Sequence, residues 1–196
     1  MIEAALGIWV IDNVMPNPSN FIKDLEGAAK SNLVTWNKAP VGRDYHLDTS
    51  VRDVAFIGVP TIVSGVYENM AESKHLQYLY KLSKQLDDAI FPHIEEYSQT
   101  HKIRIKTWEG RSILRYGAGQ FFKNHSDADA DTPRTLSYSF YLNDDYEGGE
   151  IEFDRFKLRI KPDANQLVLF PSNFMYSHEV LPVISGTRYA VVQWGL

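Results

Sequence analysis

The chain contains no cysteine among its 196 residues. Disulfides, iron–sulfur clusters, thiolate zinc sites and cysteine nucleophiles are therefore excluded. The sequence also lacks any run of Lys and Arg, and its formal net charge is −5. Tight, sequence-independent binding to nucleic acid needs basic stripes that neutralise phosphates, so this charge pattern argues against nucleic acid as a partner.

Long apolar runs are absent as well. The longest one near the start, residues 4–11, is too short to span a bilayer and has no basic flank. We therefore expect a soluble, cytoplasmic protein with no signal peptide, no transmembrane segment and no membrane partner. With 44% hydrophobic residues, a chain of this length can bury the core of one globular domain.

Two helices are predicted in the first half of the chain. Asn17 followed by Pro18 is typical of a helix start, and this helix is expected to end near Lys30. Apolar residues at spacings of three and four predict an amphipathic helix over residues 73–100, kinked or restarted at Pro92. Its apolar stripe is expected to cover one side of a sheet. Residues 37–53, between the two helices, are polar and irregular.

Beyond Lys102 the apolar spacing changes to period two, which predicts short strands. With a further strand near the start, the predicted strands are Ile8–Ile11, Ile103–Thr107, Ser112–Tyr116, Thr135–Leu142, Glu150–Phe153, Lys157–Ile160, Gln166–Phe170 and Arg188–Trp194. Such spacing favours a two-sheet sandwich or a barrel over a parallel α/β sheet. Because no linker separates the halves, we expect one domain over residues 1–196, with a helix-rich part at 1–101 and a β-rich part at 102–196.

Three residues of the β-rich part are candidate metal ligands. In His125-Ser126-Asp127 an imidazole and a carboxylate lie two residues apart, and on an extended strand such side chains point to the same face. His178 offers a third ligand. Two histidines and one carboxylate leave the other side of a metal open, which suits iron(II) enzymes that bind oxygen and an organic co-substrate. A second His-x-Asp sequence, residues 46–48, has no strand pattern behind it.

The last predicted strand has the composition of a pocket floor. Arg188, Ala190, Val192 and Trp194 fall on one of its faces, so a guanidinium and an indole are separated by small side chains. Arginine binds a carboxylate through two parallel hydrogen bonds and stays charged at all relevant pH values. The pattern therefore predicts a place for a carboxylate ligand at Arg188.

One face of the strand at 135–142 has two possible interpretations. It presents small hydroxylic residues and, at its end, Tyr141. Such a face is either a solvent-exposed strand surface or the lining of a pocket, in which Tyr141 hydrogen-bonds a ligand carboxylate. The opposite face, from Leu136 to Leu142, is apolar and is expected to pack under the helices.

Taken in order, the motifs of residues 103–196 resemble the prolyl 4-hydroxylase-like branch of the iron(II)/2-oxoglutarate oxygenases. The motifs are Tyr116-Gly117, Phe121, His125-Ser126-Asp127, the run at 136–143, Gly148-Gly149-Glu150, Leu169-Phe170-Pro171-Ser172, His178-Glu179-Val180 and Gly186-Thr187-Arg188-Tyr189. Each motif is weak alone, and their common order and spacing make the resemblance specific. The first half resembles the family only in being rich in helix.

The resemblance implies a fold and a set of site residues. The fold is α+β but mainly β, a double-stranded β-helix (jelly roll) with helices packed on one sheet. The residues that match the family's iron ligands are His125, Asp127 and His178. Arg188 matches the basic residue that pairs with the far carboxylate of 2-oxoglutarate, where many relatives have lysine. Tyr116, Tyr141 and Trp194 match further residues of the co-substrate pocket.

The implied activity is hydroxylation of a C–H bond with Fe(II), 2-oxoglutarate and O2, on a peptide, protein or amino-acid substrate, with proline the first expectation. Two alternatives remain. A nucleic-acid demethylase shares the fold and triad, but it usually has a second arginine shortly after the anchor, and none follows Arg188. A non-catalytic jelly-roll module would not need the triad. We also hypothesise that Trp36, Arg43 and Arg52 line the substrate entrance.

Overall fold

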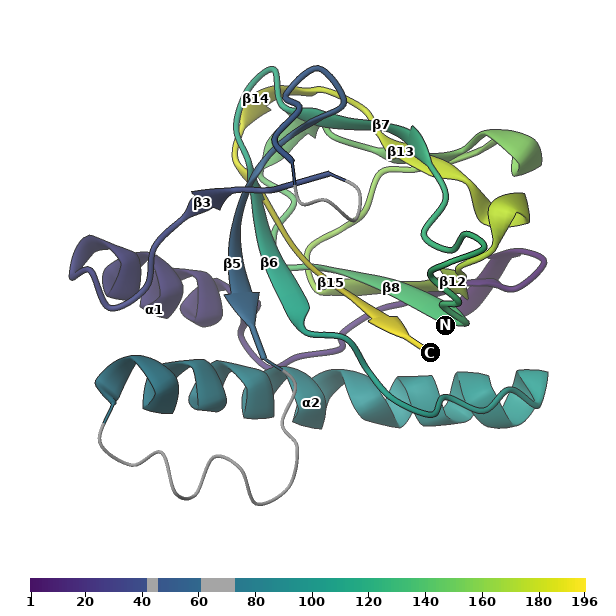
Figure 1. Cartoon of the computed structure of the whole chain (residues 1–196), viewed down its shortest axis with the longest axis horizontal. Coiled ribbons are helices and arrows are strands. Elements are labelled where there is room, and N and C mark those ends of the chain that lie inside the picture. Colours follow the sequence, from purple (N-terminus) through teal and green to yellow (C-terminus); the bar gives the residue numbers. More distant parts are fainter. Residues whose placement is uncertain (42–45, 61–72) are drawn as a thin grey trace.

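The described residues, 1–41, 46–60 and 73–196 of a computed structural model, form two facing antiparallel sheets with helices on one side (Figure 1). In spatial order, the eight-stranded sheet consists of β1 (Ile2–Ala5), β2 (Ile8–Ile11), β12 (Gln166–Pro171), β8 (Leu136–Tyr141), β15 (Arg188–Gly195), β6 (Arg111–Tyr116), β5 (Ala55–Val59) and β3 (Asn37–Lys38). The five-stranded sheet consists of β11 (Leu158–Ile160), β10 (Ile151–Phe153), β13 (His178–Val180), β7 (Phe121–His125) and β4 (Arg52–Asp53). The chain is thus mainly β, and its sheets are antiparallel as predicted.

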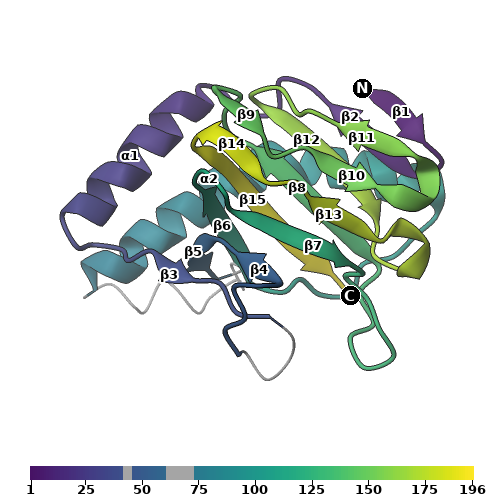
Figure 2. The same ribbon diagram turned by 90° about the horizontal axis from the view of Figure 1, so that it is seen from above.

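Smaller elements connect the two sheets. Strands β9 (Tyr146–Gly148) and β14 (Val183–Gly186) form a two-stranded sheet of their own, visible beside β15 in Figure 2. Two single-turn 3-10 helices, η1 (Asp154–Phe156) and η2 (Phe174–Tyr176), follow β10 and precede β13.

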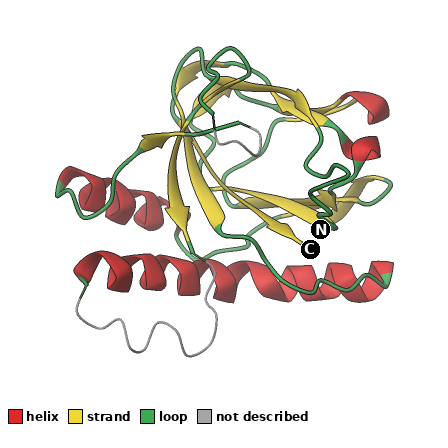
Figure 3. Cartoon of the chain, in the orientation of Figure 1, coloured by secondary structure: helices red, strands yellow, loops and turns green. Residues whose placement is uncertain are grey.

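Helices α1 (Pro18–Lys30) and α2 (Lys74–His101) both lie on the outer side of the eight-stranded sheet (Figure 3). As predicted, α1 begins with a proline after Asn17. Ser73 caps α2 by accepting a hydrogen bond from the amide of Leu76. The predicted restart at Pro92 is wrong, because α2 runs through this exposed position as one helix. Among the described residues no helix is long and apolar enough to cross a membrane.

The main core lies between α2 and the eight-stranded sheet. The stripe of α2 that includes Leu82 and Leu86 is fully buried against the apolar face of β8, including Tyr138 and Phe140. Burying each large aliphatic side chain contributes about 1.5–3 kcal/mol, so this stripe fixes the helix on the sheet. The other face of β8 is consequently turned toward the space between the sheets, and the pocket-lining interpretation of that face applies.

The first half of the chain supplies strands to both sheets. Strand β5 pairs with β6, β2 with β12, and the two-residue strand β4 with β7. The expectation that residues 37–53 are irregular throughout is therefore wrong for β3 and β4. Two-residue strands leave no detectable period in a sequence, because a period of two needs at least four positions to appear.

Six of the seven strands predicted after Lys102 are confirmed, each with bounds within one residue of β6, β8, β10, β11, β12 or β15. The strand expected at Ile103–Thr107 is wrong. Ile103 and Ile105 do pack against the main core, but the amides of Lys106 and Thr107 both bond to the carbonyl oxygen of Leu196 instead of to a neighbouring strand. Alternating burial here reflects packing without a ladder of hydrogen bonds.

Candidate metal and co-substrate site

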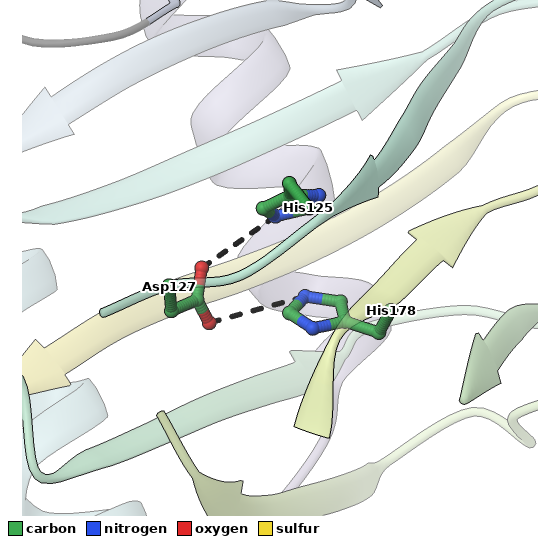
Figure 4. Close-up of side chains that lie close together, drawn as sticks. All are labelled: His125, Asp127 and His178. Atoms are coloured by element: carbon green, nitrogen blue, oxygen red, sulfur yellow. Dashed lines mark ion pairs between the residues drawn. The ribbon is translucent and has the colours of Figure 1, made fainter. Parts of the chain in front are cut away.

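The five-stranded sheet brings the three candidate ligands together (Figure 4). His125 is the last residue of β7, His178 is the first of β13, and the two are direct partners in the register of these strands. Nε2 of His125 lies 3.5 Å from Oδ1 of Asp127, and Nε2 of His178 lies 3.9 Å from Oδ2. One ligand atom from each residue falls within 4.8 Å of the others, so a single ion can contact all three.

Asp127 reaches this position from outside the strand. We predicted that His125 and Asp127 share one face of a strand, whereas β7 ends at His125 and Asp127 lies two residues beyond. The segment is held instead by the end of β12, since the amide of Ala128 donates to the carbonyl oxygen of Ser172 at 2.9 Å. The predicted proximity is confirmed, but a turn held by β12 produces it.

Both imidazoles are oriented with Nε2 toward Asp127. Nδ1 of His125 lies 2.9 Å from the carbonyl oxygen of Lys123, and Nδ1 of His178 lies 3.1 Å from that of Tyr176. A carbonyl oxygen can only accept, so Nδ1 carries the proton and Nε2 keeps its lone pair. Metal-binding histidines usually have their second nitrogen held in this way.

Burial and ionic contacts give these residues the charges that a cation needs. Burial and the neighbouring His125 lower the pKa of His178 to about 4, so its imidazole is neutral at pH 7. Burial alone would raise the pKa of Asp127, but contacts with His178 and His125 outweigh it and hold that pKa well below its usual range. A neutral imidazole and an ionised carboxylate are the forms that bind a divalent metal.

Arg188 lies at the start of β15, only 1% exposed, between two tyrosine rings. Its guanidinium carbon is 4.8 Å from the ring centre of Tyr116 and 4.9 Å from that of Tyr141. Both Nε and one terminal nitrogen of this guanidinium are buried without a hydrogen-bond partner. An unpaired buried donor costs about 1–3 kcal/mol, and more when it is charged, which indicates that a ligand completes the site.

Two tyrosine hydroxyl groups next to Arg188 also lack a hydrogen-bond partner. The hydroxyl groups of Tyr141 and Tyr146 are buried and have no partner, and burial raises the pKa of Tyr141 to about 12. Gly149 makes room for the arginine: its φ is +66°, and a Cβ there would lie 2.9 Å from Cδ of Arg188. The sequence analysis did not identify Tyr146 as a site residue. Only its position just before the Gly148-Gly149 turn could have indicated this role.

A single pocket of about 420 Å³, open to solvent, joins the triad to Arg188. Tyr116 and Trp194 line it as predicted, together with the small side chain of Ser139 from β8. Tyr141 is not among the lining residues, and its ring lies beside the guanidinium of Arg188. The lining residues are Arg52, Leu114, Tyr116, Phe122, His125, Asp127, Tyr138, Ser139, Ile151, His178, Val180, Arg188, Val192 and Trp194.

Of the three residues hypothesised to line the substrate entrance, the structure places one in the pocket. Arg52 lines the pocket. Trp36 does not, because its ring packs against Tyr189 and beneath the guanidinium of Arg115 on the α1 side of the sheet. Arg43 lies outside the described residues.

Sequence reasoning missed one charged pair next to the triad. Arg134 lies over the ring of Trp194, 4.1 Å from its centre, and forms two hydrogen bonds to the carboxylate of Glu109, at 2.6 and 2.7 Å. The same guanidinium donates to the main-chain oxygen of Asp127 at 3.0 Å. Nothing in the local sequence links residues 109 and 134, which only the fold brings together.

The residues present fit an iron(II) ion and a dicarboxylate. The triad offers two imidazole nitrogens and an ionised carboxylate at mutual distances suited to one cation. Arg188 and Tyr141 offer buried donors without partners, and these match a carboxylate at the closed end of the pocket.

Comparisons with known proteins point to the same kind of site. Residues 112–195 match the family model of the 2OG-Fe(II) oxygenase superfamily. A PKHD-type hydroxylase of Prochlorococcus marinus (strain MIT 9215) is 39% identical over 67 residues, covering 30% of this chain and 28% of the relative. A PKHD-type hydroxylase of Synechococcus sp. (strain CC9605) is 31% identical over 112 residues, covering 53% of this chain and 46% of the relative. The alignments thus span less than half the length of either curated relative.

The fold has solved counterparts. A prolyl hydroxylase from Trichoplax adhaerens, solved in complex with a peptide fragment of the oxygen degradation domain of hypoxia inducible factor, superposes with a TM-score of 0.73. The superposition covers 97% of this chain and 83% of that one, at 17% identity, and so indicates a shared fold. Motifs, family match and fold agree: residues 112–195 match the 2OG-Fe(II) oxygenase superfamily, and the chain shares its fold with a prolyl hydroxylase.

Proposed function

We propose that the chain is an Fe(II)- and 2-oxoglutarate-dependent hydroxylase of the prolyl 4-hydroxylase type. One observation supports this best: the triad and the partnerless guanidinium of Arg188 face a single pocket. A metal site alone would suit many activities, whereas a metal site beside a buried, unpaired arginine suits a co-substrate with a carboxylate at its far end.

Each residue then has a definite task. His125, Asp127 and His178 hold the iron, and Arg188 with Tyr141 holds the far carboxylate of 2-oxoglutarate. Tyr116 and Trp194 form pocket walls that exclude water and orient the bound molecules. When bound, iron, 2-oxoglutarate and O2 together supply the oxidant for a C–H bond, and the protein supplies positions and electrostatics. The substrate that we infer is a prolyl residue of a peptide, or a related amino acid.

The fold proposed for this activity is the double-stranded β-helix, with His125 and His178 on the five-stranded sheet, Asp127 just beyond the end of β7, and Arg188 on the eight-stranded sheet. We further propose that residues 1–196 act as one oxygenase domain. The pairing of β5 with β6 and of β4 with β7 supports this, because strands of the first half complete sheets that contain the site.

Succinate formation from 2-oxoglutarate tests the proposed function. The Fe(II)-loaded protein is incubated with 2-oxoglutarate and, separately, with proline-containing peptides, free proline and a methylated oligonucleotide. We expect succinate together with a gain of one oxygen on a peptide or amino acid, detected by mass spectrometry. Loss of the methyl group from the oligonucleotide, with peptides and amino acids unchanged, would instead favour the nucleic-acid demethylase.

A further inference from the structure

Arg52 is a second guanidinium in the same pocket, and the proposed roles of iron and 2-oxoglutarate do not use it. It comes from the two-residue strand β4, opposite Phe122 of β7. Its guanidinium carbon lies 4.6 Å above the centre of the Phe122 ring, and that ring is stacked on His125 at 3.7 Å. The stack places Arg52 next to the metal triad.

The contacts of Arg52 leave its charge uncompensated. One terminal nitrogen donates to the carbonyl oxygen of Pro40 at 3.1 Å, and Nε is buried without a partner. The adjacent Asp53 is occupied elsewhere, pairing with Lys38 and accepting from Gln120. Within the described part of the chain, no carboxylate forms an ion pair with Arg52. Accordingly, burial lowers the pKa of Arg52.

Arg134, whose guanidinium also lies near the triad, differs from Arg52 because a carboxylate compensates its charge. Arg134 forms a two-pronged pair with Glu109, so its charge is already balanced. Arginine stays protonated even when buried, and a buried cation therefore needs an anion from somewhere. Because the described residues supply no such anion to Arg52, we look for it in a ligand.

The occupants already proposed cannot provide it. The two positive charges of Fe(II) and the one of Arg188 balance the single negative charge of Asp127 and the two of 2-oxoglutarate. Both carboxylates of the co-substrate are also engaged, one at the metal and one at Arg188. A loaded pocket consequently keeps one surplus positive charge, that of Arg52, which lines the pocket together with the triad.

We propose that Arg52 binds a carboxylate of the molecule that is hydroxylated. The substrate class is thereby narrowed to amino acids with a free α-carboxylate and to peptides with an acidic side chain next to the target residue. The planar guanidinium and its unpaired Nε match a carboxylate held through two hydrogen bonds. This inference rests on the proposed function, because it assumes that iron and 2-oxoglutarate occupy the rest of the pocket.

Matched acid and amide probes test the proposal without requiring turnover. The protein is loaded with Mn(II) and 2-oxoglutarate, and binding of each probe is measured by the paramagnetic broadening of its proton resonances. The probes are L-proline with L-prolinamide, and blocked pentapeptides centred on proline that carry Glu or Gln at each flanking position. The first pair reports on a free amino acid, and the peptides report on an acidic neighbour.

For the wild-type protein we expect at least one acid to bind about ten- to a hundredfold more tightly than its amide, as a charge-assisted pair provides. Arg52→Gln should abolish that difference, and Arg52→Lys should restore part of it. Arg159→Gln is the matched control, because Arg159 forms an exposed pair with Glu152 on β10. This control should keep the wild-type preference.

Equal affinity for acid and amide in every pair, with the wild-type protein, overturns the proposal without any variant. An acid preference that survives Arg52→Gln overturns it too. Affinities for Mn(II) and 2-oxoglutarate are measured in the same samples. If the wild-type protein binds both but shows no acid preference, only the role of Arg52 fails; if it binds neither, the proposed function itself fails.

Discussion

Arg134 donates a hydrogen bond to the main-chain carbonyl oxygen of Asp127, at 3.0 Å. The residue that supplies the only carboxylate of the triad is thus fixed through its backbone, while its side chain stays free to face the imidazoles. Glu109 holds Arg134 in place through two hydrogen bonds, and Trp194 lies beneath it. Because β7 ends before Asp127, this contact and the hydrogen bond from the amide of Ala128 to the carbonyl oxygen of Ser172 restrain the ligand in place of the sheet.

Replacing Arg134 should therefore weaken metal binding without removing a ligand. For Arg134→Gln we expect Mn(II) affinity to fall about tenfold, the lower end of what outer contacts of metal sites contribute. Glu109→Gln should have a smaller effect in the same direction. Calorimetric titration measures both, with Arg159→Gln as the control that removes an exposed arginine–glutamate pair. A folded Arg134→Gln protein with wild-type affinity would show that the contact does not position Asp127.

Arg188 should control affinity for 2-oxoglutarate. Arg188→Ala removes the charged partner of the far carboxylate, so the dissociation constant of 2-oxoglutarate in the Mn(II) protein should rise about ten- to a hundredfold. Arg188→Lys should retain part of the affinity, since lysine keeps the charge but loses the planar fork. Unchanged affinity in Arg188→Ala would place the carboxylate elsewhere.

Gly149 gives a second way to disturb the same contact. A methyl group there would lie 2.9 Å from Cδ of Arg188, on a backbone with φ of +66°. Gly149→Ala should destabilise the fold by about 1–3 kcal/mol and weaken 2-oxoglutarate binding. Gly27→Ala is the control: this glycine of α1 has nothing within 4 Å of the added carbon, so the change should stabilise by up to about 1 kcal/mol. Urea denaturation and 2-oxoglutarate titration distinguish the two, and equal stability changes would contradict the account.

The metal-free protein should lose stability in mild acid. The pKa of His178 falls to about 4 in the folded state, mainly through burial, from a usual value near 6.5. The unfolded chain therefore binds more protons between these two pH values, and stability declines as the pH falls from about 6.5 to 4, by up to roughly 3 kcal/mol. Chemical denaturation in the presence of a chelator measures this slope. A flat profile in wild type, or an equal slope in His178→Gln, would assign the effect to other groups.

The sequence allowed much of the fold to be predicted where one element carries its own pattern. The apolar stripe of α2 and the period-two strands β6, β8, β10, β11, β12 and β15 are local signals, and the structure confirms them. Ile103–Thr107 shows the limit, because alternating burial does not distinguish a strand from a segment that packs irregularly at the end of the chain. Strands β3 and β4, with two residues each, are too short to have a period, and only tertiary pairing defines them.

For the candidate site, too, the sequence identifies some residues, whereas others are found only in the structure. The triad and Arg188 could be found because their residue types and order match a known family, and the structure brings them to one pocket. The Arg134–Glu109 pair and the free hydroxyl of Tyr146 could not, since each depends on contacts between segments that are distant in sequence. Arg52 was suspected from its segment alone, and its lack of an anionic partner became visible only in the folded chain.

Titration of Mn(II) into the metal-free protein tests the central claim most directly, because it asks whether these three residues form the metal site. We expect one ion to bind per chain in the wild type, and affinity to fall roughly a hundredfold in His178→Ala, since two ligands hold a labile divalent ion poorly. His46→Ala, which alters the other His-x-Asp sequence, should bind as the wild type does. Wild-type affinity in His178→Ala, or loss of binding in His46→Ala, would contradict the assignment of the site.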